Sequence, residues 1–195
     1  MDIKEVLNKY FLGDENLYYE LYGNGALNIT YRVYRGNESY ILQKMNKIID
    51  PLVMNNIEAI TKHLISKNIL TGEIIKTIDG ELFVIDDTSW WRIFTYIDGI
   101  SFISIQSKKQ AEEAGKFLGE FHNALLDCNY DFKYNIPHYH DIDFDIKNLE
   151  QTLFNNIKTE KYEKLKDLGE YILEEYKKIH LDIILPLRIT HQDLK

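Results

Sequence analysis

The stretch NLYYELYGNGALNITYRVYRGNESYILQKMN, residues 16–46, decides the fold of this chain. The tetrapeptide RGNE at residues 35–38 has the chemistry of a tight turn between strands. Tyr, Ile, Val and Leu favour strands, and they are concentrated here in three runs, at residues 17–22, 29–34 and 39–45. The pattern predicts three consecutive strands at the start of a sheet.

A helix and further strands are predicted downstream. Asp50 is a typical N-cap and Pro51 a typical first helical residue, and apolar residues recur behind them at helical spacing to about Asn68. In EIIKTIDGELFVID, residues 73–86, an Asp-Gly pair separates two β-like runs, which predicts a hairpin. Residues 90–97 predict another strand.

The pattern changes after the Asp-Gly pair at residues 98–99. Ser107 is a suitable cap for a helix whose apolar stripe continues to Leu125. Two more helices are predicted at residues 143–156 and 159–179, and a short buried strand at residues 182–190. We therefore expect an α+β protein with a β-rich lobe, residues 1–97, and a helical part, residues 98–195.

Composition limits the functional classes. The chain has 195 residues, of which 31 are acidic and 23 basic, and its net charge of −8 argues against a general nucleic-acid binder. A single cysteine, Cys128, excludes an internal disulfide and favours a reducing compartment. The amphipathic N-terminus is not a signal peptide, and no apolar run is long enough to span a membrane. We expect a cytoplasmic protein, and the oligomeric state stays open.

A short glycine-containing segment, GNGALN at residues 23–28, lies between the first two predicted strands. Gly23, Asn24 and Gly25 could bring backbone N–H groups close to a phosphate, although such a sequence is more often a simple turn. It is not a Rossmann motif, because Asn28 takes the place of the third glycine and a strand follows.

A lysine and a glutamate could form a phosphate-binding pair. Lys44 lies near the end of the third predicted strand, and Glu58 lies on the following helix. Their pairing would hold the ammonium group against the phosphates of a nucleotide. The alternative is that both are ordinary exposed residues.

The most specific motif is HQDLK, residues 191–195. An aspartate two residues after a histidine, behind a buried strand, suits a base that accepts a proton from an attacking hydroxyl. In this interpretation Asp193 is the base, His191 shapes the loop, and Lys195 balances phosphoryl charge. The alternative is a surface loop that contains these residues by chance.

Several other polar and aromatic residues have structural explanations. The cluster at residues 138–143 fits no zinc spacing and suits a loop that leads into a helix N-terminus. His122 is expected to be packed and hydrogen-bonded, and Trp90 and Trp91 to be core and cleft-wall residues. The cluster comprises His138, His140, Asp141 and Asp143.

The order of these parts resembles that of protein-kinase-like phosphotransferases. The motifs YILQKMN, WWRIFTYIDG, FHNALL and RITHQDLK are similar to those of the aminoglycoside phosphotransferase and choline kinase superfamily, closest to its N-acetylhexosamine 1-kinase-like branch. A classical protein kinase is the nearest alternative, since HQDLK also resembles its catalytic loop. The two additional helices before that loop favour small-molecule kinases.

The resemblance implies a bilobal kinase-like fold, with an antiparallel small lobe and a partial helical large lobe. It also implies an enzyme that uses ATP and Mg²⁺ to phosphorylate a hydroxyl of a sugar, amino sugar, aminoglycoside or choline-like acceptor. The family pattern assigns residues 23–28, Lys44 and Glu58 to the phosphates, and Asp193 to catalysis. The hinge that binds adenine would comprise Thr95, Tyr96 and Ile97.

The metal ligands of the family follow its catalytic loop. They would lie beyond Lys195, so we expect a chain truncated after the His-x-Asp motif. The alternative function is a catalytically inactive fragment that at most binds nucleotide.

Overall fold

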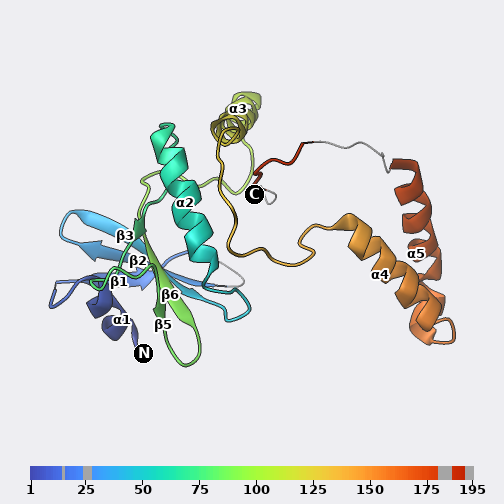
Figure 1. Cartoon of the computed structure of the whole chain (residues 1–195), viewed down its shortest axis with the longest axis horizontal. Helices are drawn as coiled ribbons and strands as arrows, with labels where there is room; N and C mark the ends of the chain where they lie inside the picture. The colour runs from blue at the N-terminus through green and yellow to red at the C-terminus, as the bar shows by residue number, and fades with distance from the viewer. Residues whose placement is uncertain (15, 24–27, 180–185, 192–195) are drawn as a thin grey trace. The chain divides into compact units, whose positions relative to one another are not determined.

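The computed structural model describes residues 1–14, 16–23, 28–179 and 186–191, in two compact units (Figure 1). The first unit is Met1–Asn135 and the second is Ile136–Lys195. Each unit has its own packing, and the lobe boundary expected near residue 98 stays a prediction.

The first unit is built on a six-stranded sheet in which all pairs are antiparallel. The order is β1-β2-β3-β6-β4, and β5 also pairs with β6. The three strands predicted from residues 16–46 are confirmed as β1, β2 and β3, and Arg35 pairs with Glu38 across the predicted turn. The strands are β1 Tyr18–Leu21, β2 Ile29–Arg35, β3 Glu38–Met45, β4 Ile74–Ile75, β5 Val84–Ile85 and β6 Trp90–Thr95.

The predicted hairpin around Asp79-Gly80 is wrong in its pairing. Gly80 does form a turn, with φ of 86° and its N–H donating to Thr77. However, β4 and β5 pair with β6 and not with each other, because β4 pairs with Ile93 and Phe94 while β5 pairs with Trp90 and Trp91. The two short strands therefore share one edge of β6.

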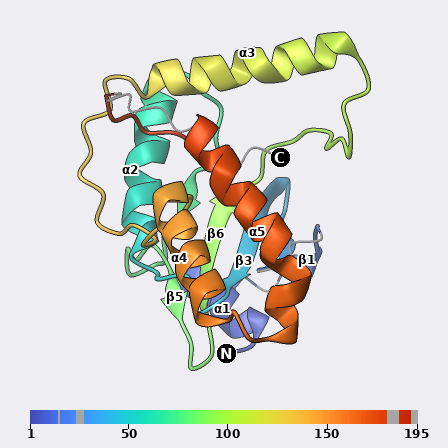
Figure 2. The ribbon, with the colours of Figure 1, turned by 90° about the vertical axis from the view of Figure 1, so that its right-hand side faces the viewer.

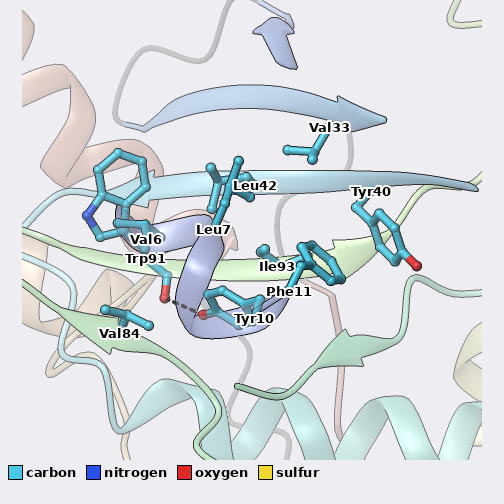
Figure 3. Close-up of a cluster of buried hydrophobic side chains, with 10 residues drawn as sticks. All are labelled: Val6, Leu7, Tyr10, Phe11, Val33, Tyr40, Leu42, Val84, Trp91 and Ile93. Carbon is cyan, nitrogen blue, oxygen red and sulfur yellow. Dashed lines mark hydrogen bonds between the residues drawn. The ribbon is translucent and has the colours of Figure 1, made fainter. Parts of the chain in front are cut away.

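One face of the sheet is covered by α1, Ile3–Tyr10. Asp2 caps this helix through a capping box with Glu5, and the apolar side of the helix enters the main core (Figure 3). The buried tyrosine hydroxyl of Tyr10 donates to the Trp91 carbonyl at 3.1 Å. The core residues are Val6, Leu7, Tyr10, Phe11, Val33, Tyr40, Leu42, Val84, Trp91 and Ile93.

The opposite face packs on α2, Val53–Ser66, through a second cluster formed by Met45, Met54 and Trp90. The helix is confirmed, but its predicted cap is wrong. Asp50 accepts a hydrogen bond from the Leu52 N–H at 2.8 Å in the preceding turn, and Leu52 occupies the N-cap position without a side-chain bond.

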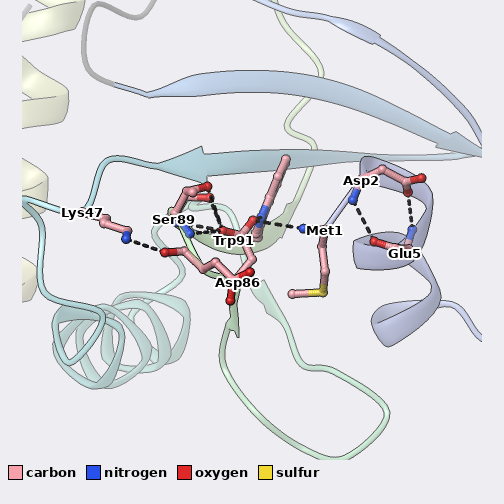
Figure 4. Close-up of polar contacts among 9 residues, drawn as sticks. Met1, Asp2, Glu5, Lys47, Asp86, Ser89 and Trp91 are labelled. Carbon is pink, nitrogen blue, oxygen red and sulfur yellow. Dashed lines mark hydrogen bonds and ion pairs between the residues drawn. The ribbon is translucent and has the colours of Figure 1, made fainter.

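Asp86 fixes the connection between β5 and β6 (Figure 4). Its carboxylate accepts hydrogen bonds from the Trp91 indole N–H at 2.8 Å and from the Thr88 and Ser89 backbone N–H groups, each at 2.8 Å. Burial alone would raise the pKa of this carboxyl, but these hydrogen bonds hold the pKa well below its usual value of 3.8.

The remaining helices follow the sequence closely. Helix α3, Lys108–Ala124, begins after Ser107, whose side chain accepts from the Gln110 N–H as its sequence predicts. In the second unit, α4, Ile142–Asn155, and α5, Glu160–Ile179, pack side by side (Figure 2). None of the described helices is long and apolar enough to cross a lipid bilayer.

Candidate functional site

The segment predicted to bind adenine directly follows the central strand β6. The Thr95 N–H donates to the Glu73 carbonyl at 2.9 Å, and the Tyr96 N–H donates to the Ser39 carbonyl at 3.1 Å. Ile97 is 41% exposed, and its backbone makes no hydrogen bond to any residue that the structure describes. The N–H groups of Thr95 and Tyr96 are thus engaged, whereas that of Ile97 is available to a ligand.

The structure does not bring Lys44 and Glu58 together. Successive strand residues point to opposite faces of a sheet, and Lys44 shares the α1 face with Leu42 and Trp91. Its ammonium nitrogen lies 5.2 Å from the centroid of the Trp91 ring. Glu58, by contrast, lies on α2 on the other side of the sheet.

Glu58 forms ion pairs with two other lysines. Its carboxylate lies 2.8 Å from the ammonium group of Lys62, one turn further along α2, and 2.9 Å from that of Lys76, which follows β4. Hydrogen bonds from Lys62 and Lys76 lower the pKa of Glu58. The nucleotide-binding roles assigned to Lys44 and Glu58 stay predictions, and the structure separates the two residues.

The predicted glycine loop is tied to the sheet at its Asn28 end. Gly23 has φ of 75°, a conformation that favours glycine, whereas Asn24 and Gly25 lie outside the described residues. Asn28 accepts a hydrogen bond from the Asn46 N–H at 3.1 Å, which ties the start of β2 to the end of β3. Contact between this loop and phosphates stays a prediction.

The catalytic motif lies mostly outside the described part of the chain. Asp193 is not described, and His191 belongs to the second unit. The buried strand expected at residues 182–190 is wrong for its described half, because residues 186–190 form no strand and Leu187 is 97% exposed. The roles of Asp193 and His191 therefore stay predictions.

Two histidine predictions have clear outcomes. His122 is packed against Phe121, but its Nε2 atom is buried without a hydrogen-bond partner in the described chain, so the predicted hydrogen bond is absent there. His138 Nδ1 lies 2.9 Å from the carboxylate of Asp141, which caps α4 by accepting from the Phe144 N–H at 3.0 Å. The loop preceding residue 142 is thus a helix cap, as predicted.

The carboxylate of Asp141 has a lowered pKa because of the His138 contact and the cap hydrogen bond. Within the described ranges, no group of three His, Cys, Asp or Glu residues could hold a metal ion.

Three polar residues on the α2 side of the sheet have roles that we did not predict. Asn56 is buried in α2 and donates to the Tyr134 carbonyl at 2.6 Å while accepting from the Lys133 N–H at 2.8 Å. Gln43 and Arg92 face α2 from neighbouring strands and contact each other. The signal for this pair in the sequence is the alternation of side chains between the two faces of each strand, in the segments YILQKM and WWRIFT.

No family model matches the chain, but solved structures do. A spectinomycin phosphotransferase, solved with ADP and spectinomycin, matches with a TM-score of 0.53 at 15% sequence identity. An aminoglycoside phosphotransferase from Alicyclobacillus acidocaldarius matches with a TM-score of 0.57 at 11% identity. The chain has the aminoglycoside phosphotransferase fold.

This similarity confirms the predicted α+β, kinase-like fold class. It extends over 90% and 91% of this chain, but the chain spans only 57% and 51% of the two solved structures. In this chain, the sheet and α2 belong to the first compact unit, and α4 and α5 belong to the second.

Proposed function

We propose that this chain carries the nucleotide-binding part of a phosphotransferase that transfers the γ-phosphoryl group of ATP to a hydroxyl of a small molecule. The observation that supports this proposal is the fold, which matches over 90% of the chain a phosphotransferase solved with ADP. The acceptor class comprises sugars, amino sugars, aminoglycosides and choline-like alcohols. A cytoplasmic location is part of the same proposal.

The chemistry assigns few tasks to protein side chains. In the proposed reaction, the acceptor oxygen forms a bond to the γ-phosphorus while the bond between this phosphorus and the bridging oxygen breaks and releases ADP. Asp193 accepts the hydroxyl proton, and His191 positions the catalytic segment. The backbone of residues 23–28 binds phosphates, and the backbone of residues 95–97 binds adenine.

A second candidate is a chain that binds nucleotide without turnover. This candidate requires the proposed nucleotide contacts but not the proposed roles of Asp193 and His191. The Mg²⁺ that phosphoryl transfer requires would neutralise phosphate charge, and among the described residues no group of three His, Cys, Asp or Glu side chains is placed to hold it.

One experiment separates the two candidates. The chain is incubated with ATP, Mg²⁺ and a panel of sugars, amino sugars and choline, and ADP formation is measured. The phosphotransferase proposal expects ADP formation that Asp193→Asn abolishes. Thermal stabilisation by ATP without ADP formation supports the second candidate, and the absence of both effects contradicts both.

A further inference from the structure

The α2-facing side of the sheet carries a polar row across three neighbouring strands. Thr30 on β2, Gln43 on β3 and Arg92 on β6 are direct cross-strand partners. The Gln43 amide nitrogen donates to the Thr30 hydroxyl at 3.3 Å, and the Arg92 Nε donates to the Gln43 amide oxygen at 2.9 Å. Gln43 thus holds the guanidinium through Nε and leaves its terminal nitrogens for other partners.

Arg92 is a partly buried cation that has no carboxylate partner among the described residues. In the described chain no carboxylate oxygen lies within 4 Å of it, and its neighbours are the Met54 sulfur at 3.7 Å from Nη1 and the Phe94 ring at 4.9 Å from Cζ. Burial lowers the pKa of Arg92 to about 10, so the side chain remains charged at neutral pH. A buried charge is normally paired, and the residues that the structure describes offer Arg92 no group of opposite charge.

The second terminal nitrogen of Arg92 is free to bind an anion. Nη2 has no hydrogen-bond partner among the described residues, and it is not among the polar atoms that are closed off from solvent. A guanidinium held at Nε by a neutral amide presents the remaining N–H groups in a fixed plane, which suits phosphate oxygens.

Arg32 adds a second cation to the same face. It is the cross-strand partner of Ile41, two residues from Thr30 along β2, and therefore points toward the same side as Arg92. Its guanidinium stacks on the hinge residue Tyr96, with 3.8 Å from Cζ to the ring centroid. Its Nη2 atom donates to the Ser39 hydroxyl at 3.3 Å. In the described chain its buried Nε atom has no hydrogen-bond partner, and no carboxylate pairs with the guanidinium.

Two arginines that lack a carboxylate partner in the described part of the chain are unusual in a protein with net charge −8. Arg35, for comparison, is bound at 2.8 Å to Asp14. On the α2-facing side of the sheet, the guanidinium groups of Arg32 and Arg92 lie on β2 and β6, while Lys44 points to the α1 side. Glu20, the cross-strand partner of Arg32, accepts a hydrogen bond from the Tyr34 hydroxyl at 2.5 Å. Next to β3, the cation on the α2-facing side is Arg92, which lies on the neighbouring strand β6.

We propose that Arg92, held by Gln43, is the side chain of this lobe that contacts the phosphate groups of a bound nucleotide, with Arg32 as a second positive charge. This inference rests on the proposed function, and it places the phosphate contact on β6, not on Lys44.

Binding of ATP, ADP and adenosine to the 195-residue chain, measured by isothermal titration calorimetry, tests this proposal. Arg92→Gln is expected to weaken ATP binding by about tenfold or more, the effect of losing a hydrogen bond to a charged group, and to leave adenosine binding unchanged. Arg35→Gln, which removes an arginine outside this face, is the matched control.

A second variant covers the case in which Arg92→Gln does not fold. Gln43→Glu has nearly the same shape and places a carboxylate beside Arg92, so it is expected to weaken ATP binding without weakening adenosine binding. Circular dichroism checks that each variant is folded.

Three results would overturn the proposal. The first is unchanged ATP affinity in Gln43→Glu, and the second is an equal loss of ATP and adenosine binding in Arg92→Gln. The third is a larger loss of ATP binding in Lys44→Gln than in Arg92→Gln. If the unaltered chain binds neither ATP nor adenosine, the proposed function fails as well; if it binds both and only these variant effects are missing, the role of Arg92 alone fails.

Discussion

Replacing Asp86 by alanine is expected to destabilise the first unit strongly. The side chain is only 4% exposed, and its carboxylate accepts from the buried Trp91 indole and from the backbone N–H and hydroxyl of the buried Ser89. Alanine leaves these donors without an acceptor. Since each buried unsatisfied donor costs about 1–3 kcal/mol, we expect a loss of about 2–4 kcal/mol in the free energy of unfolding.

Asp86→Asn tests the role of the charge. The amide keeps one acceptor oxygen but turns an NH₂ group toward one set of donors, so the expected loss is about 1–3 kcal/mol. Because the folded-state pKa of Asp86 is lowered, its contribution is complete above its ordinary pKa of 3.8 and is lost as the pH falls through the folded-state value. The difference in the free energy of unfolding between the native chain and Asp86→Asn should therefore shrink as the pH falls below 3.8.

Urea unfolding followed by tryptophan fluorescence measures this effect. The chain has two tryptophans, Trp90 and Trp91, and both lie in β6, so the signal reports on the sheet. Asp87→Asn is the control, since Asp87 is exposed and its neighbour Asp86 makes the carboxylate contacts. A loss below about 1 kcal/mol for Asp86→Ala, or a difference that grows on acidification, would refute the reasoning.

Two further predictions concern connections between elements. Asn56→Ala removes the contacts from α2 to residues 133–134, and we expect limited proteolysis to cut residues 128–135 faster than in the native chain; unchanged cleavage would contradict this role. In the second unit, a Cβ at Gly169 would lie 2.8 Å from Leu153 Cδ1. Overpacking of about 1–3 kcal/mol should outweigh the gain of about 1 kcal/mol in helix propensity, so Gly169→Ala should lower thermal stability. In a Leu153→Ala background the same change should stabilise, and additive effects in this double-mutant cycle would argue against the clash.

The order and type of the main elements could be predicted because they depend on local patterns. The three strands of residues 16–46, helix α2 and the capped helix α3 follow from strand-forming runs and helical spacing. Pairing was harder, because β4 and β5 each contain two residues and their partner is decided by the edge of β6. The strand propensity of a segment does not indicate with which other strand it pairs.

The candidate site was less predictable, since it depends on which face each side chain occupies. Lys44 was assigned from its place near the end of a strand, yet a one-residue difference decides between the α1 and α2 faces. The side chain of Gln43 faces α2 instead, and Arg92 joins it from a strand almost fifty residues later. Only the register of β3 with β6 shows this contact.

The strands at the two edges of the sheet are short, and this affects how the protein behaves at high concentration. One edge is β1, with four residues, and the other is divided between β4 and β5, with two residues each. A strand from another molecule would find only a few consecutive backbone groups to pair with at either side. The sheet therefore resists growth into intermolecular β-structure by its geometry, without charged residues having to block its edges.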